Sequence, residues 1–135
     1  MARSSARAAA MQLIYERMMG GAGGDDTLLG LLQLNPSEDD TAYLTDVVSG
    51  VSENQGELDE AIEKHLVDWT LARLARVDLA ILRLACYEMM RRADIPASVS
   101  INEAVELAHT FSTPEAASFI NGVLGSLLRS GELRQ

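Results

Sequence analysis

Residues 95–124 read IPASVSINEAVELAHTFSTPEAASFINGVL and contain the signals for two consecutive helices. Ser100 and Glu103 have the spacing of a capping box, in which the two side chains satisfy backbone N–H groups at a helix start. Thr113 followed by Pro114 is typical of an N-cap and the first helical position. The stretch therefore predicts one helix, a short break and a second helix.

Other polar residues at this end of the chain do not have a single structural role assigned by local rules. Ser112 and Glu115 form an alternative capping box for the second helix, and the sequence does not choose between the two starts. Asn102 and Asn121 are not explained by local helix rules, so we expect both to be buried and hydrogen-bonded to backbone at the helix junction. Gly131 is expected to end the second helix.

The rest of the chain has the same helical character. Of its 135 residues 47% are hydrophobic, mostly Leu and Ala, and only 4% are aromatic, which favours helices over strands in a single domain spanning residues 1–135. Thr70 and Asp78 are expected to cap a short turn and a central, most buried helix. The pattern predicts about seven helices and no sheet. The helices are expected at residues 2–19, 27–34, 39–51, 57–67, 78–92, 100–109 and 113–130, with a short turn at residues 70–74.

Cysteine content and hydropathy indicate a cytoplasmic protein. The single cysteine, Cys86, lies in an apolar run and cannot form an internal disulfide, which suits a reducing compartment. The first residues contain arginines but no continuous apolar core of a signal peptide. No apolar run approaches the roughly 18 residues that span a bilayer, so no membrane association is expected.

Charge is distributed unevenly along the chain. The net charge of −9 argues against a simple nucleic-acid binder, because phosphate contacts require Lys and Arg. Residues 18–63 contain eleven acidic residues and no Lys or Arg, which is typical of a solvated surface. Residues 1–19 contain three arginines against one glutamate, so a local basic face can exist on this acidic protein.

Searches for catalytic and metal sites find no enzyme signature. His65 and His109 have no Cys, His or carboxylate at zinc-site spacing. Cys86 has no activating neighbour in the sequence. The glycines of residues 20–24 lack the Lys-Ser/Thr of a phosphate loop, so a linker is expected there. Neither a metal nor another cofactor is predicted.

A binding surface is the remaining candidate for function. Arg3, Arg7 and Tyr15 fall on one i, i+4 row of the first helix, which combines phosphate anchors with a ring that can stack on an unpaired base. The same spacing also fits a solvated helix end with Tyr15 in the core. Phe119 has the same two interpretations, a core residue or a platform beside a helix N-terminus.

Five blocks of the chain, in order, resemble the NusB family of bacterial transcription antitermination factors. The blocks are residues 6–15 (ARAAAMQLIY), 58–59, 76–89 (RVDLAILRLACYEM), 95–112 and 119–124 (FINGVL). The resemblance implies an all-α fold of two packed helical subdomains. It also implies binding to the boxA element of nascent ribosomal RNA. The implied partners are NusE, which is a small-subunit ribosomal protein and forms a heterodimer with the factor, and the RNA polymerase antitermination complex. It implies no catalysis and no cofactor.

The resemblance also assigns roles to individual residues. Asp78 and His65 match the family's NusE surface. The N-terminus departs from the family, since RSSAR has two arginines where a dense run is common. With the net charge of −9, this predicts weak RNA binding by the protein alone and dependence on a basic partner. The positions that match the family's RNA surface are Arg3, Arg7, Tyr15, Arg83, Glu115 and Phe119.

Two rival functions stay open at this point. The acidic residues 18–63 and the few arginines also suit a protein-interaction or homodimer module with little or no RNA binding. An apolar face on residues 27–34 could be buried in such a dimer or against the core. A regulatory subunit of an RNA-modifying enzyme is a third interpretation, and gene neighbourhood would test it.

Overall fold

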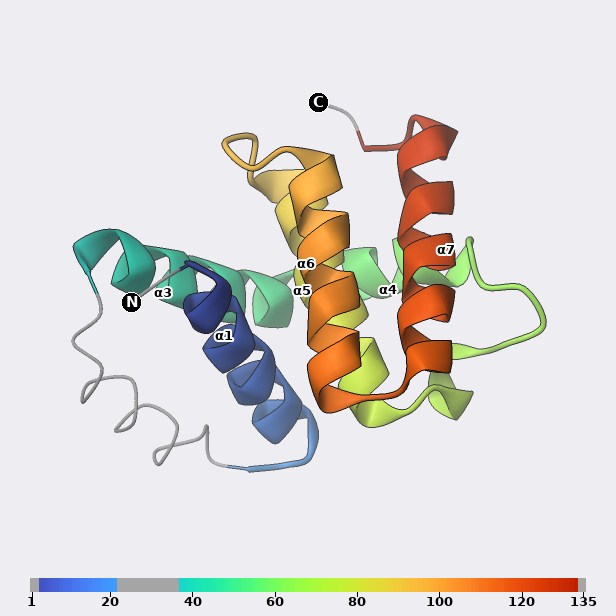
Figure 1. Ribbon diagram of the computed structural model, residues 1–135, viewed down its shortest axis with the longest axis horizontal. Helices are drawn as coiled ribbons and strands as arrows, with labels where there is room; N and C mark the ends of the chain where they lie inside the picture. Colours follow the sequence, from blue (N-terminus) through green and yellow to red (C-terminus); the bar gives the residue numbers. More distant parts are fainter. Residues whose placement is uncertain (1–2, 22–36, 134–135) are drawn as a thin grey trace.

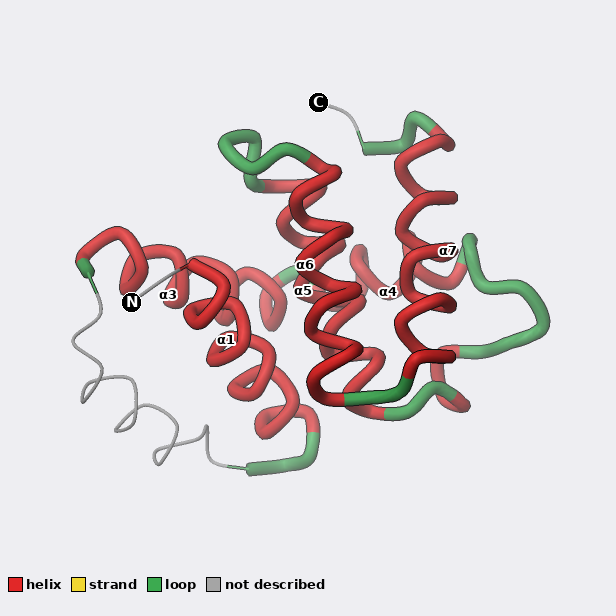
Figure 2. The backbone as a smooth tube through the Cα atoms, in the orientation of Figure 1, coloured by secondary structure: helices red, strands yellow, loops and turns green. Residues whose placement is uncertain are grey.

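The computed structural model describes residues 3–21 and 37–133, and within them it contains helices and loops but no strand (Figure 2). The predicted short helix at residues 27–34 lies outside these ranges. None of the described helices has the length and apolar content to cross a membrane. The elements are α1 (Arg3–Met18), α3 (Glu38–Glu53), α4 (Gln55–Glu63), the 3-10 turn η1 (Leu71–Arg73), α5 (Arg76–Arg91), α6 (Ala97–Phe111) and α7 (Pro114–Ser130).

Helix α5 is the centre of the molecule. It contacts α1, α3, α4, α6 and α7, and eleven of its sixteen residues are buried. Helices α1 and α3 pack together on one side of it and α7 lies on the other, while α6 overlies α5 in Figure 1 and packs against both α5 and α7. The expected all-α fold is therefore confirmed, with α5 joining the two groups of helices.

Two helix starts and one helix end follow the local sequence signals. The hydroxyl of Ser37 accepts a hydrogen bond of 3.1 Å from the backbone N–H of Asp40, which caps α3. The hydroxyl of Thr113 accepts one of 2.9 Å from the N–H of Ala116, so Thr113 is the N-cap of α7. Gly131 ends α7 with a left-handed φ of 77°. Of the two predicted starts for this helix, the structure contains the one at Thr113.

The predicted cap at Asp78 was wrong, whereas Thr70 lies at the N-cap position of the short turn η1, as predicted. Helix α5 begins earlier than expected, with Ala75 at its N-cap position and no side-chain cap bond. Asp78 lies in the first turn, where its carboxylate accepts a 2.7 Å hydrogen bond from the hydroxyl of Ser112. Thr70 precedes η1 but makes no side-chain cap bond. Local rules assigned the Asp78 side chain to a helix cap, but it forms a hydrogen bond with Ser112, which is distant in sequence.

The predicted capping box at Ser100 was wrong for the same reason. Helix α6 begins at Ala97, so Ser100 is inside the helix, where its hydroxyl donates a 2.7 Å hydrogen bond to Glu88 of α5. Glu103 accepts a hydrogen bond from Ser4 and forms an ion pair with Arg7, both in α1, instead of capping α6. Both side chains join α6 to other helices.

Asn102 and Asn121 were expected to be buried at the junction of α6 and α7, and this expectation was wrong. Both residues are exposed. Their neighbours Ile101 and Ile120 are buried, so each asparagine lies on the solvent side of its helix. The polar positions in residues 95–124 therefore follow the ordinary amphipathic pattern at these two places.

Cys86 is expected to be unreactive in the folded protein. Its side chain is fully buried in α5, and burial raises the pKa of its thiol to about 12. Because the thiolate is the reactive form, the native protein at pH 8 should not react with a thiol reagent such as 5,5′-dithiobis(2-nitrobenzoate), whereas the urea-unfolded protein should react completely. Absorbance at 412 nm measures the thionitrobenzoate that the reaction releases. Fast stoichiometric reaction of the native protein would show that α5 is less buried than described.

Candidate nucleic-acid interface

Arg7, one of the predicted RNA-binding residues, is buried in an ion pair. Its Nε donates a 2.8 Å hydrogen bond to Glu88, and its Nη1 lies 3.4 Å from a carboxylate oxygen of Glu103. Burial alone would lower the pKa of the guanidinium, but the hydrogen bond and charge of Glu88 outweigh burial and raise it. Arg7 is only 5% exposed, so a phosphate contact would require these pairs to open. Its RNA role stays a prediction.

Glu88 is the centre of a buried polar cluster that connects four helices. It accepts hydrogen bonds from Arg7 of α1, from the hydroxyl of Tyr43 in α3, and from Ser100 of α6. Burial and the Glu88 carboxylate raise the pKa of Tyr43, which keeps its hydroxyl protonated as a donor. We name Arg7, Tyr43, Glu88 and Ser100 the Glu88 cluster.

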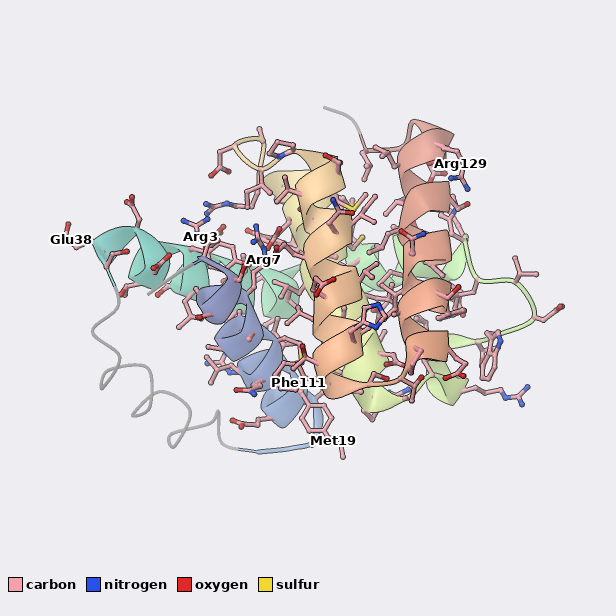
Figure 3. The ribbon with its side chains drawn as sticks, viewed as in Figure 1. Arg3, Arg7, Met19, Glu38, Phe111 and Arg129 are labelled. Atoms are coloured by element: carbon pink, nitrogen blue, oxygen red, sulfur yellow. The ribbon has the colours of Figure 1, made fainter. Side chains whose placement is uncertain are left out.

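Arg3 and Tyr15 are more accessible than Arg7. The side chain of Arg3 is 33% exposed, with its Nε 3.3 Å from Asp40 and its guanidinium 4.5 Å from the centroid of the Tyr43 ring. Figure 3 shows it at the N-terminal end of α1, one turn from Arg7. Tyr15 is half-buried and packs against the core from α1. Of the α1 residues predicted to bind RNA, Arg3 keeps the most solvent-accessible charge.

Arg83 is also held in an ion pair. Its Nε and Nη2 each donate a 2.8 Å hydrogen bond to the carboxylate of Asp59, which joins α5 to α4. Arg83 is 7% exposed. It borders a small pocket of about 130 Å³ that is also lined by the exposed Arg17 of α1. Bidentate pairing of this kind fixes a guanidinium geometrically, so Arg83 acts here as a structural link.

The structure brings three other predicted residues together in one groove. Phe119 and Glu115 of α7 and Asp78 of α5 line a space of about 440 Å³, to which η1 and the loop before it also contribute. Thr113 is the N-cap of α7, so Glu115 and Phe119 both belong to its first turns. Because they are four residues apart, they lie on the same face of the helix. The RNA and partner residues predicted separately from the sequence thus share a site.

Trp69 and Arg73, which were not predicted as site residues, complete this groove. The Trp69 ring is 47% exposed and lies edge-on to Phe119, with centroids 6.3 Å apart and planes at 60°. The Arg73 guanidinium is 5.4 Å from the centroid of the Trp69 ring. Asp68 has a left-handed φ of 63° directly before Trp69. No local sequence signal indicates this pair, because residues 68–70 break the helical pattern. We call Trp69, Arg73, Asp78, Glu115 and Phe119 the aromatic groove.

His65, predicted for the partner surface, lies away from the aromatic groove. Its Nδ1 is 2.8 Å from the hydroxyl of Ser126 and its Nε2 is 3.1 Å from Glu132. The hydrogen bond to His65 lowers the pKa of Glu132. These contacts connect the end of α4 to α7 and the turn after it. Among the described residues, no three His, Cys, Asp or Glu side chains gather so as to hold a metal ion.

Apart from Arg83 on α5, the predicted RNA residues occupy two separate regions. Arg3, Arg7 and Tyr15 are on α1, whereas Glu115 and Phe119 are on α7, and α5 and α6 lie between these helices (Figure 1). A ligand that contacts both regions has to be extended, as a single strand of nucleic acid is.

Comparison with known proteins gives a consistent family. The model of the NusB family matches residues 4–129. The transcription antitermination protein NusB of Acetivibrio thermocellus is 48% identical over 130 residues, which cover 96% of this chain and 90% of the relative. The structure of T. maritima NusB has a TM-score of 0.84 at 28% identity, covering 96% of this chain and 92% of that one. A structure of the antitermination factors NusB and NusE with dsRNA has a TM-score of 0.81 at 25% identity, covering 95% and 96%. This protein belongs to the NusB family.

Proposed function

We propose that this protein is a non-enzymatic transcription antitermination factor that binds boxA RNA as a heterodimer with NusE. The observation that carries the proposal is the family match over residues 4–129, with relatives that are transcription antitermination proteins. The similar structure of NusB and NusE with dsRNA supports both partners. We further propose that the complex acts in the cytoplasm on the elongating RNA polymerase.

The arrangement of charge on the structure supports a shared RNA site. Arg7 and Arg83 are buried and engaged in ion pairs, which leaves Arg3, Arg17 and Arg73 as the accessible arginines of the two candidate regions. Three such arginines, of which Arg3 is also paired with Asp40, provide few phosphate contacts on a protein of net charge −9. A basic partner would supply the others, so the heterodimer and not the single chain is the tight RNA binder.

RNA affinity is expected to depend on the partner. Fluorescence anisotropy with a labelled boxA-like RNA at physiological salt should show weak binding by this protein alone and much tighter binding after NusE is added. For single-stranded RNA, a plot of the logarithm of the binding constant against the logarithm of the salt concentration has a slope of about −0.7 for each phosphate contacted. The slope should therefore be steeper for the heterodimer. Tight binding by the isolated protein would contradict the partner requirement, and no binding by the heterodimer would refute the RNA function.

An arginine substitution tests whether α1 takes part. Arg3→Gln should weaken RNA binding by the heterodimer and make its salt dependence shallower, because one accessible phosphate contact is lost. Arg129→Gln is the matched control, since Arg129 is exposed at the far end of α7 and lies well away from Arg3 (Figure 3). Equal effects of both substitutions would indicate a general charge effect. Arg7 is unsuitable for this test because its loss would disturb the Glu88 cluster.

A homodimer module with little RNA binding is the second candidate, and one observation favours it. Met19 after α1 and Phe111 at the end of α6 are 56% and 37% exposed, and both lie at the same end of the molecule in Figure 3. Exposed large apolar side chains are common at protein interfaces. Native mass spectrometry of the protein alone, with NusE and with RNA separates the candidates, since a homodimer that does not bind RNA supports only the second.

A further inference from the structure

We propose that the aromatic groove holds one unpaired RNA base against Trp69, and that Asp78 and Glu115 select bases that carry an exocyclic amino group. This inference rests on the proposed RNA function and adds a base pocket and its preference. The observations that carry it are an aromatic pair whose tryptophan is exposed, a neighbouring guanidinium and two carboxylates around one space of about 440 Å³.

Trp69 is suited to stacking because much of its ring is accessible. Its 47% exposure is large for a side chain of which folded proteins bury most. The edge-on contact with Phe119 fixes the ring from one side, and Phe119 is itself half-buried against the core. A ring held in this way loses little conformational freedom when a base stacks on it. The space of about 440 Å³ lies in the range of roughly 300–1,000 Å³ found for small-molecule sites.

The charges around the groove favour a base inside it and a phosphate at its rim. Asp78 and Glu115 are acceptors when ionised, so they repel phosphate and receive N–H donors. Ser112 donates to one oxygen of Asp78 at 2.7 Å, which holds this carboxylate in place while leaving it further acceptor capacity. The exposed Arg73 can pair with the phosphate next to the bound base, and its guanidinium also stacks on rings.

The same charges disfavour a basic peptide as the occupant. A peptide rich in Lys and Arg would be attracted by Asp78 and Glu115 but would meet Arg73 at the mouth of the groove, beside the ring it would have to cover. An RNA strand places its phosphate at Arg73 and its base between the aromatic rings and the carboxylates. Each group in the groove then contacts a group of opposite or complementary character.

Base preference follows from hydrogen-bond chemistry. Cytosine and adenine present amino groups, which carboxylates accept, whereas uracil presents carbonyl oxygens on both sides of a single N–H. Two carboxylates facing those carbonyls would be repelled. The groove should therefore bind a cytosine or an adenine better than a uracil.

Trp69 is the only tryptophan in the chain, so its fluorescence reports occupation of the groove directly. The protein alone is titrated at low salt with fluorescein-labelled eight-nucleotide oligo(C), oligo(A) and oligo(U), and anisotropy measures binding anywhere on the surface. Parallel titrations with unlabelled oligonucleotides measure quenching of Trp69. We expect quenching by oligo(C) and oligo(A) that follows the anisotropy, with several-fold weaker binding of oligo(U).

Substitutions separate stacking from base selection. Trp69→Ala should weaken oligo(C) binding by roughly 5- to 150-fold, the range expected for loss of one base–aromatic stack, and Trp69→Phe should restore most of it. Val67→Ala is the matched control, because Val67 is 75% exposed in the same loop and should leave affinity unchanged. The double variant Asp78→Asn with Glu115→Gln should reduce the preference for oligo(C) over oligo(U). Circular dichroism confirms that each variant is folded.

Each contrary result has a distinct meaning. Anisotropy binding without quenching, at an affinity that Trp69→Ala does not change, would overturn the base pocket while the RNA function stands. An unchanged ratio of oligo(C) to oligo(U) affinity in the double variant would overturn the selection by carboxylates. Loss of NusE binding by Trp69→Ala at unchanged RNA affinity would assign the groove to the protein partner. Absence of RNA binding even by the heterodimer would refute both the function and the pocket.

Discussion

Replacing Glu88 by glutamine is expected to lower the free energy of unfolding by about 3 kcal/mol, the lower end of the range for removing one partner of a buried ion pair. Glu88 is 1% exposed and is the counter-charge of Arg7, which is 5% exposed. Glutamine keeps the shape and one acceptor oxygen, but the guanidinium would then be buried with only the more exposed Glu103, 3.4 Å away, to balance it. Urea unfolding followed by circular dichroism measures the loss.

A surface ion pair provides the control for Glu88→Gln. Glu57 pairs with Arg91, and the two side chains are 47% and 41% exposed. Exposed pairs contribute about 0–1 kcal/mol, so Glu57→Gln should change the free energy of unfolding by less than about 1 kcal/mol. If the two variants lose the same amount of stability, the Glu88 cluster is not the link between helices that its burial indicates.

Replacing Gly50 by alanine is expected to destabilise the protein by about 1–3 kcal/mol, the usual cost of overpacking. Gly50 is buried within α3, and a Cβ atom there would overlap the ring of Tyr87 from α5. The ring cannot move freely, because the Tyr87 hydroxyl donates a 2.7 Å hydrogen bond to Asp46. This close approach of α3 and α5 requires the absence of a side chain at position 50.

The matched control for Gly50→Ala is Gly122→Ala, which is expected to stabilise the protein. Gly122 lies in the middle of α7, is exposed, and has no atom within 4 Å of the position that a Cβ would take. Alanine there should raise the free energy of unfolding by roughly 0.5–1 kcal/mol, because glycine loses more backbone entropy in a helix. Thermal unfolding of both variants measures the difference. Stabilisation by Gly50→Ala would show that Tyr87 yields easily.

Much of the fold could be predicted from the sequence because helices are specified locally. The apolar spacing places the helices near their observed bounds, and Thr113 and Gly131 mark the ends of α7. The failures occur where a polar side chain leaves its local role for a distant partner. Ser100 and Asp78 both have the right residue type for a cap but bond to Glu88 and Ser112 instead.

The candidate site was predictable only in part, for the same physical reason. An arginine stripe on a helix looks the same whether it faces solvent or a buried carboxylate, and the partner of Arg7 lies 81 residues further along the chain. Trp69 and Arg73 were missed because Asp68-Trp69-Thr70 carries no helical periodicity, so nothing local indicates what lies opposite. Phe119 and Asp78 were predicted, but their meeting in one groove depends on the packing of α7 beside α5.

The Glu88 cluster also has a consequence for the order of folding during synthesis. Helix α1 is made before the other described helices, but the acceptor of its buried guanidinium and the hydroxyl of Ser100 belong to α5 and α6. At about 5–20 residues per second, the 81 residues between Arg7 and Glu88 take roughly 4–16 s to translate. During that interval α1 lacks its counter-charge. The long sequence separation of this contact therefore makes docking of α1 a late step, completed only after the ribosome has released the centre of the molecule.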